Sequence, residues 1–319
     1  MSEIVLGVGA SHSTLMNTHW EQTLHKDRAE RFRDALGAAR AELARTRPDT
    51  VVLIGSNHFR GFWLDLIPPF TLGVGECIAS GESGTPKGPQ PVDVPLARHI
   101  ADSLVESGRF DPAFSARLQI DHGQSHAIHY LLDGLDVEIV PLVVNVFAQP
   151  LPTLQRCQEL GRAIREAVLA FPGDRRVAVV GSGGLSHRLP WPDWREPHGD
   201  DEEFMVGAWL NGRDNWQDYD KRRREIIRAA EASLTPEFDN EFLTLLERGE
   251  AHRLTAYTTE ELEKAAGNGA QELRTWLLMA AALDHAPARR LAYEPMPEWL
   301  TGMGVAVIDP AAADAGQSA

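Results

Sequence analysis

The hydrophobic positions of this chain form short apolar runs that alternate with amphipathic stretches. Short continuous apolar runs bounded by turn residues are typical of buried strands, and a repeat of three to four residues among good helix formers is typical of helices. The predicted strands are 3–9, 49–56, 137–147 and 175–183, and the predicted helices are 28–46, 93–108 (with Asp93 as N-cap) and 154–171. Strands that alternate with helices indicate a largely parallel α/β sheet.

The pattern changes after residue 187. Residues 188–220 are rich in Trp, Asp, Pro and Gly and predict an insertion of loops or short helices, whose four tryptophans favour packing over a lid. Residues 73–91 are rich in Gly and Pro and predict a loop, either ordered on the surface or a mobile flap. Further helices are expected in KRRREIIRAAEASL, DNEFLTLLERG and QELRTWLLMAAALDH, and a final strand in EWLTGMGVAVIDP.

The chain of 319 residues shows no internal repeat and no linker. With 43% hydrophobic residues it is long enough to bury a large core. We therefore expect one domain over residues 1–310. The stretch AAADAGQSA at the end predicts a flexible tail over 311–319.

Charge and cysteine content narrow the classes of partner. The 31 Lys and Arg against 46 Asp and Glu give a net charge of −15, which disfavours nucleic acid and anionic membranes. The two cysteines, Cys77 and Cys157, form no C-x-x-C motif, as expected for reduced thiols in a cytoplasmic protein. No signal peptide and no apolar run of membrane-spanning length is visible.

Glycine-rich turns follow several predicted strands, but none has the spacing of a nucleotide site. GVGASH carries His12 where a dinucleotide fingerprint needs its last glycine. GSGGLSH lacks the Gly-Lys-Ser/Thr of a phosphate-binding loop. No serine stands in a G-x-S-x-G nucleophile elbow, so serine hydrolysis also loses its main support.

Histidines stand at the ends of the predicted strands instead. His12, His58 and His187 each follow a strand, and His122 lies in a loop that could join them. A lone histidine in such a place is usually structural, but the carboxyl ends of parallel strands share one crevice, so three in matching positions predict a cluster. Convergent imidazoles suit a transition metal, and two of them with one carboxylate suit non-haem Fe(II). Spacing alone does not choose that carboxylate, and the remaining imidazoles would be free for proton transfer.

The other histidines give no such signal, and we expect them to be structural or solvated. They are His19, His25, His99, His126, His129, His198, His252 and His285.

Seven segments together resemble the class III extradiol ring-cleavage dioxygenases, the family of the protocatechuate 4,5-dioxygenase β subunit. They are ASHSTL, GSNHFRGFWLDLIPPFTLGVG, IDHG, GSGGLSH, DNEFLTLLERG, QELRTW and MPEWLTGMG. The likeness runs in order from residue 4 to about 308, and it is strongest to members that act on 2,3-dihydroxyphenylpropionate. The resemblance implies a single three-layer α/β/α domain with a mostly parallel mixed sheet, which often assembles into homo-oligomers.

The resemblance also implies residue roles. The Fe(II) ligands would be His12, His58 and Glu272, and the two acid–base histidines would be His122 and His187. Glu272 is chosen by the resemblance, because by itself it would be interpreted as a solvated helix residue. Arg60 departs from the neutral polar residue of the dihydroxyphenylpropionate members, and it is a candidate to bind a substrate carboxylate or to cap a loop.

The expected activity is O2-dependent cleavage of a substituted catechol, of the 2,3-dihydroxyphenylpropionate type, to a ring-opened dienoic acid. The segments after IDHG and around 190–216 also differ from those members, which leaves other ring substrates open: a 2-aminophenol, a hydroxypyridone or a biaryl catechol. A Zn(II) hydrolase built on the same histidines is a further alternative. A non-enzymatic binding protein is disfavoured because all five candidate positions are intact.

Overall fold

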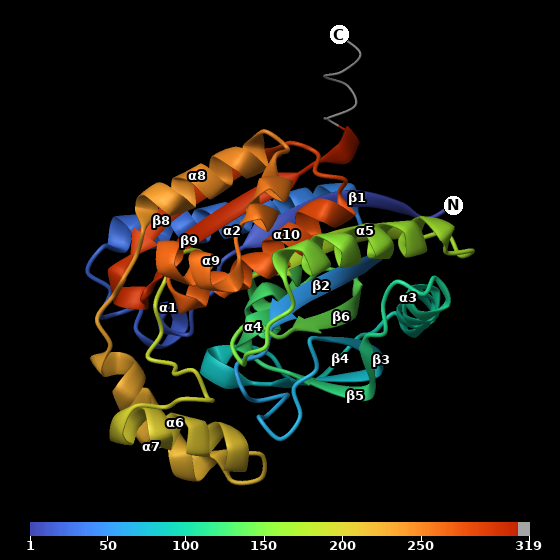
Figure 1. Ribbon diagram of the computed structural model, residues 1–319. Helices are drawn as coiled ribbons and strands as arrows, with labels where there is room; N and C mark the ends of the chain where they lie inside the picture. Colours follow the sequence, from blue (N-terminus) through green and yellow to red (C-terminus); the bar gives the residue numbers. More distant parts are fainter. Residues whose placement is uncertain (312–319) are drawn as a thin grey trace.

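The computed structural model describes residues 1–311 and builds them around one mixed sheet (Figure 1). Within these residues the sheet has nine strands in the order β4-β3-β6-β2-β7-β1-β9-β8, and β5 pairs with β3. The strands are β1 (Glu3–Ala10), β2 (Thr50–Ser56), β3 (Phe70–Ser80), β4 (Lys87–Gln90), β5 (Ala113–Ile120), β6 (Glu138–Val144), β7 (Arg176–Ser182), β8 (Ala288–Met296) and β9 (Thr301–Ile308). The predicted α/β class is confirmed, and the tail expected at 311–319 lies, beyond Ala311, outside the described residues.

The centre of the sheet is parallel. β6, β2, β7 and β1 run side by side in the same direction, and these are the four strands that the apolar runs predict. Antiparallel partners flank them, with β9 beside β1 and β3 beside β6. β9 therefore brings the end of the described chain next to its beginning.

Helices cover both faces of the sheet. Along β2, Val52 and Ile54 face one core with α3 (Val94–Glu106), α5 (Leu154–Ala170) and α10 (Leu273–Ala282), while Val51 and Leu53 face a second core with α2 (Lys26–Thr46). All four side chains are fully buried, so both faces of the sheet are covered. The helices are α1 (Leu15–Thr18), α2 (Lys26–Thr46), α3 (Val94–Glu106), α4 (His122–Ala127), α5 (Leu154–Ala170), α6 (Gly199–Asn211), α7 (Trp216–Ala229), α8 (Pro236–Glu247), α9 (Thr259–Ala266) and α10 (Leu273–Ala282). The arrangement is a three-layer α/β/α sandwich (Figure 1).

The segment 73–91 corrects one prediction. The expected loop or flap is mostly strand, because β3 extends to Ser80 and β4 pairs with its last residues. Its glycines permit close strand contact: a Cβ on Gly75 would lie 2.3 Å from the carbonyl oxygen of Ala116 on β5. Gly75 therefore marks close backbone packing in the sheet, whereas Gly81 and Gly84, which have positive φ, lie in the turn between β3 and β4.

The Trp-rich insertion is helical in its second half. It contains α6 and the first residues of α7, which contact each other beside the layers of the sheet (Figure 1). The predicted N-cap of α3 is also confirmed, since the Asp93 carboxylate accepts a hydrogen bond of 3.1 Å from the backbone N–H of Leu96.

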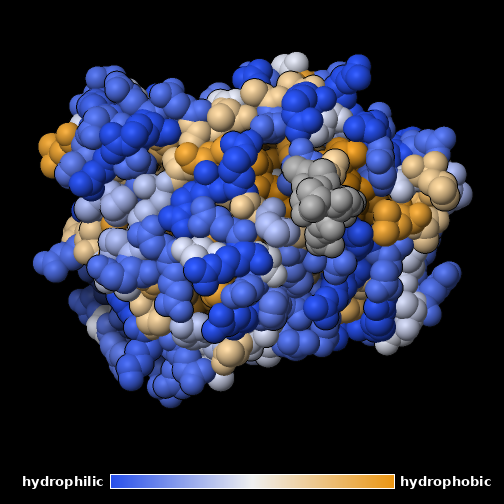
Figure 2. Space-filling view, turned by 90° about the horizontal axis from the view of Figure 1, so that it is seen from above, coloured by the Kyte–Doolittle hydropathy of each residue, from blue (hydrophilic) through white to orange (hydrophobic). Residues whose placement is uncertain are grey.

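The surface is mainly polar on the face shown in Figure 2, where hydrophobic residues show in separate areas between hydrophilic ones. The chain has 24% charged residues, close to the average for globular proteins. Residues 1–311 include no helix with the length and apolar character needed to cross a bilayer.

Candidate metal centre

The site lies where adjacent parallel strands end. β2, β7 and β1 are neighbours, and Ala10 at the end of β1 is level with Ser182 at the end of β7. The loops that follow these strands carry His12, His58 and His187, as the sequence predicts. Together with His122, the first residue of α4, they line one cavity of about 450 Å³. A cavity of this volume accommodates a substituted aromatic ring.

Glu272 reaches the same cavity from the opposite end of the chain. It ends a 3-10 turn (Asn268–Glu272) just before α10, and only 2% of its surface is exposed. Its Oε1 atom lies 3.5 Å from Nε2 of His12 and 3.5 Å from Nε2 of His58. The carboxylate is held by the Ser56 hydroxyl and by the backbone N–H of Gly184, which donates at 2.6 Å.

His12 is fixed through one ring nitrogen and open at the other. Its Nδ1 lies 3.0 Å from the hydroxyl oxygen of Ser182, while its buried Nε2 has no hydrogen-bond partner among the described residues. Burial lowers the pKa of His12 to about 3, against the opposing charge of Glu272. His12 is therefore a neutral imidazole whose free nitrogen faces a carboxylate.

His58 is surrounded by acids. The Asp121 carboxylate accepts a hydrogen bond of 2.6 Å from the His58 backbone N–H, and its other oxygen lies 3.2 Å from Nδ1 of the ring. Burial alone would lower the pKa of His58, but Asp121 and Glu272 outweigh it and raise that pKa to about 9. Burial likewise acts to raise the pKa of both carboxyls, yet the neighbouring histidines hold them well below their usual range. Two ionised carboxylates thus face one imidazolium.

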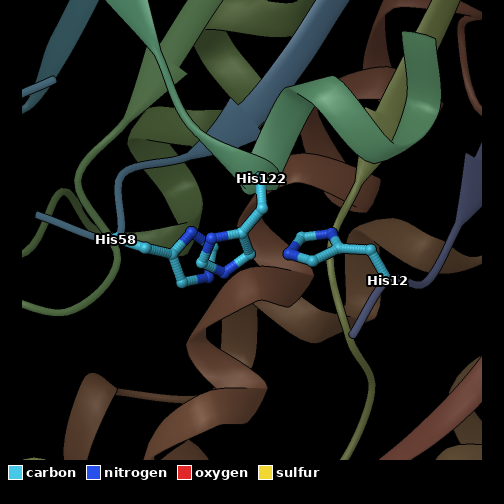
Figure 3. A group of neighbouring side chains, drawn as sticks. All are labelled: His12, His58 and His122. Atoms are coloured by element: carbon cyan, nitrogen blue, oxygen red, sulfur yellow. The ribbon is translucent and has the colours of Figure 1, made fainter. Parts of the chain in front are cut away.

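His122 lies close to both of these histidines. Donor atoms of His12, His58 and His122 lie within 4.8 Å of one another, and Figure 3 shows the three rings converging from separate elements. The Nδ1 atom of His122 lies 2.6 Å from the Glu82 carboxylate, which holds the ring with Nε2 free. The three histidines fit a metal site, so this geometry offers His122 as a ligand as well as an acid–base group.

His187 closes the cluster on the side of β9. Its Nδ1 lies 2.8 Å from the Leu185 carbonyl and 3.1 Å from the Thr301 hydroxyl, so Nδ1 carries the proton for that carbonyl. Its Nε2 lies 4.0 Å from Glu272, and burial lowers the pKa of the ring. Gly269 packs on this ring, since a Cβ there would lie 2.1 Å from it.

The tryptophans of the insertion divide between packing and lining. Trp209 is buried and stacks on Phe59, with ring centroids 4.3 Å apart, as the packing prediction expects. Trp191 packs edge-on against Phe147 but also lines the cavity, and so does Trp216. Trp194 is 38% exposed. The insertion therefore supplies one aromatic wall of the site.

Arg60 also lines the cavity, but its charge is already neutralised. Its Nε forms an ion pair of 2.6 Å with Glu82, and a terminal nitrogen lies 3.5 Å from Asp220. The guanidinium further lies 4.3 Å from the centre of the Trp216 ring. These contacts place Arg60 in the wall of the site.

Sequence reasoning missed the side chains that orient the histidines. Two of these side chains lie in motifs that the sequence analysis had already singled out for their histidines. Asp121 directly precedes His122 in IDHG, and Ser182 lies in GSGGLSH, which contains His187. Glu82 stands in the segment expected to be a loop, and no pattern singles it out. His126, expected to be structural or solvated, is buried and stacks on His12 with ring centroids 5.7 Å apart. These positions follow only from the three-dimensional fold.

Comparison with known families decides the class. Residues 6–304 match the family described as the catalytic LigB subunit of aromatic ring-opening dioxygenase. The chain belongs to this family. The prediction of an extradiol-type ring-cleaving dioxygenase is confirmed at the level of the family, which covers nearly the whole chain.

Curated relatives agree with this LigB-family assignment. The 2,3-dihydroxyphenylpropionate/2,3-dihydroxicinnamic acid 1,2-dioxygenases of Escherichia coli strains K12 and SMS-3-5 are each 37% identical over 283 residues, which are 84% of this chain and 88% of the relative. A solved structure of an uncharacterized Escherichia coli K12 protein aligns over 95% of this chain and 99% of that chain, at a TM-score of 0.48 and 14% identity. That structural likeness supports no further conclusion.

Proposed function

We propose that this LigB-family chain is an Fe(II)-dependent extradiol dioxygenase that cleaves a catechol with a side chain of the phenylpropionate type. The observation that carries the proposal is the position of Glu272, 3.5 Å from the Nε2 atoms of both His12 and His58. The relatives named for 2,3-dihydroxyphenylpropionate support the substrate class.

The residues present fit such an ion. His12 offers a buried Nε2 with no other hydrogen-bond partner among residues 1–311, and Glu272 offers an ionised carboxylate oxygen. Two imidazoles and one carboxylate are the donor set of non-haem Fe(II) oxygenases. His12, His58 and Glu272 would hold the ion, with Ser182 and Asp121 orienting the two imidazoles from behind. When bound, the ion would supply Lewis-acid coordination of both substrate oxygens and redox contact with O2.

His122 is assigned as the base for a substrate hydroxyl. Glu82 accepts the hydrogen bond from its Nδ1, so Nε2 is the free acceptor on the cavity side. The imidazolium that forms when His122 takes this proton lies beside the Glu82 carboxylate. Burial acts to raise the pKa of Glu82, but His122 and Arg60 hold it low. This pairing stabilises the imidazolium without moving the proton to Glu82.

His187 is assigned to protonate the O2-derived oxygen that departs when the O–O bond breaks. Its Nδ1 is committed to the Leu185 carbonyl, so its chemistry is confined to Nε2. Because burial lowers the pKa of His187, its protonated form would readily give a proton to the oxygen on which negative charge develops as that bond breaks. Thr301 and Gly269 keep this ring in place.

The test is anaerobic reconstitution with Fe(II), followed by O2 uptake and absorbance scanning with a panel of rings. The panel is 2,3-dihydroxyphenylpropionate, an unsubstituted catechol, a 2-aminophenol, a hydroxypyridone and a biaryl catechol. A yellow product with stoichiometric O2 uptake from the propionate supports the proposal. Preference for another ring overturns the substrate, and Zn(II) loading with hydrolysis and no O2 uptake overturns the activity. Homo-oligomeric assembly and a cytoplasmic location stay predictions.

A further inference from the structure

One face of α7 lines the cavity. Asp220, Arg223, Arg224, Ile227 and Arg228 all border the cavity, and their spacing of three to four residues places them on one stripe of the helix. The sequence KRRRE suggests a solvated basic run, yet part of it faces inward. This stripe makes that side of the cavity basic.

The arginines of this stripe and the nearby Arg60 differ in how their positive charges are neutralised or solvated. Arg224 pairs with Asp220 at 2.5 Å and is largely exposed. Arg60, which follows β2 and contacts α7, is paired with Glu82 and Asp220. Arg228 is exposed at the rim, where water solvates it. None of these three needs an additional anion.

Arg223 is the exception. It is 6% exposed, its Nε is a buried donor without a hydrogen-bond partner, and it forms no ion pair within residues 1–311. Burial and the nearby charge of Arg60 lower its pKa to about 9 against the opposing effect of Glu82 and Asp220, neither of which forms an ion pair with it, so it remains a cation at neutral pH. A buried cation without a directly paired counter-ion is costly, and an anion that enters the cavity and pairs with it reduces that cost.

The residues that line the cavity indicate the chemical class of this anion. The histidines and Glu272 line one part of it, Trp191 and Trp216 provide aromatic walls, and Arg223 lies on the α7 side. A ligand that fits these three parts has a diol, an aromatic ring and a carboxylate. A guanidinium is suited to a carboxylate because it can donate two parallel hydrogen bonds.

We propose that Arg223, rather than Arg60, binds the carboxylate of the substrate's side chain and thereby selects acidic catechols. This inference rests on the proposed ring-cleavage function and adds a residue that determines specificity. Arg60 then acts on the wall of the site, where it holds Glu82 and Asp220 in place. Arg228 and Lys87 at the cavity border attract the anion on its way in.

The test compares Arg223→Met with the matched control Arg222→Met. Met keeps much of the side-chain length without the charge, and Arg222 is an exposed neighbour that pairs with Asp201 and does not line the cavity. With 2,3-dihydroxyphenylpropionate, Arg223→Met should lower kcat/KM on the order of 10²-fold, mainly through KM. With 3-propylcatechol, which lacks the carboxylate, the loss should be at least about ten times smaller. The control should retain the wild-type preference.

Two measurements that need no turnover complete the test. 3-Phenylpropionate, which has the carboxylate but no diol, should bind the wild-type protein in calorimetry, compete with the substrate and lose affinity in Arg223→Met. The thermal midpoint of Arg223→Met should not fall below wild type, because a buried uncompensated charge has been removed. An unchanged preference for the acid, or undiminished 3-phenylpropionate binding, overturns the assignment of Arg223. Absence of ring cleavage in the wild type instead overturns the proposed function, while the binding measurement still decides the role of Arg223.

Discussion

Glu272 Oε1 lies 3.5 Å from His12 Nε2, and both side chains are almost completely buried. Residues that are far apart in the sequence therefore meet at one point. The contact depends on the tertiary fold, because His12 follows β1 and Glu272 lies in the turn before α10. Glu272 touches His58 at the same distance, so it bridges two imidazoles.

Glu272→Gln tests this bridge. The amide has nearly the same volume and its oxygen can still accept the Gly184 N–H, but it carries no charge for a cation. Fe(II) affinity should fall by about 10²-fold or more. This loss exceeds the roughly 10- to 100-fold that is typical when a residue hydrogen-bonded to a metal ligand is substituted. Metal titration under anaerobic conditions measures this. The matched control, Glu260→Gln, alters an exposed glutamate on α9 and should leave affinity unchanged. Equal affinity in both variants would remove Glu272 from the ligand set.

His122→Asn separates the two roles that the geometry offers to His122. If it is an acid–base residue, the variant retains Fe(II) while kcat falls by about 10²–10⁴-fold. Iron content after gel filtration and kcat are measured on the same sample, with His12→Ala as the reference for loss of a ligand. Iron loss as great as in that reference would show that His122 is a ligand.

Glu82→Gln tests whether Glu82 positions His122. The change removes the carboxylate that accepts the Nδ1 hydrogen bond and that pairs with Arg60. We expect kcat to fall by about tenfold or more because the His122 imidazolium loses its partner, while the iron content is preserved. Glu76→Gln is the control, since Glu76 lies in β3 but is exposed and pairs with Arg117. Iron loss in Glu82→Gln, or an unaltered kcat, contradicts this role.

The four central strands and three of the helices could be predicted because their signals are local. Each of these strands is a continuous apolar run, and the fully buried β2 is one of them. The edges were harder: β5 alternates between exposed and buried residues and β3 contains glycines, so neither gives an uninterrupted run. Their strand character comes from pairing with neighbours far away in sequence.

The sequence likewise predicted some residues of the site and not others. His12, His58 and His187 follow strands, so their convergence is a consequence of parallel pairing. Glu272 and Arg223 sit among helix-forming residues and look solvated in sequence. Only packing shows that Glu272 faces His12 and His58 and that Arg223 faces the cavity. Local sequence patterns do not predict contacts that depend on how helices pack against a sheet.

Metal binding should release a proton from His58. Among the protein groups alone its pKa is raised to about 9, so below that pH a metal ion must displace a proton, whereas His12 is already neutral. Apparent affinity should rise about tenfold per pH unit from pH 6 to 8, with about one proton released per ion at pH 7. Calorimetry in buffers of different ionisation enthalpy measures the count. Asp121→Asn removes an acid that raises this pKa, so it should reduce the release. Affinity independent of pH would contradict the assigned charge of His58.

Gly269→Ala should disturb His187 without touching the metal ligands. A Cβ at this position would lie 2.1 Å from the His187 ring, and that ring is held by the Leu185 carbonyl and the Thr301 hydroxyl. The ring must therefore move, and we expect kcat to fall by about 10²-fold or more while Fe(II) affinity stays within about threefold of wild type. Gly207→Ala is the matched control, because a Cβ there meets nothing within 4 Å and alanine favours the α6 helix. The control should keep full activity and gain up to about 1 kcal/mol in unfolding free energy. If Gly269→Ala retains wild-type kcat, the exact position of His187 is not required for turnover, and its role as the acid fails.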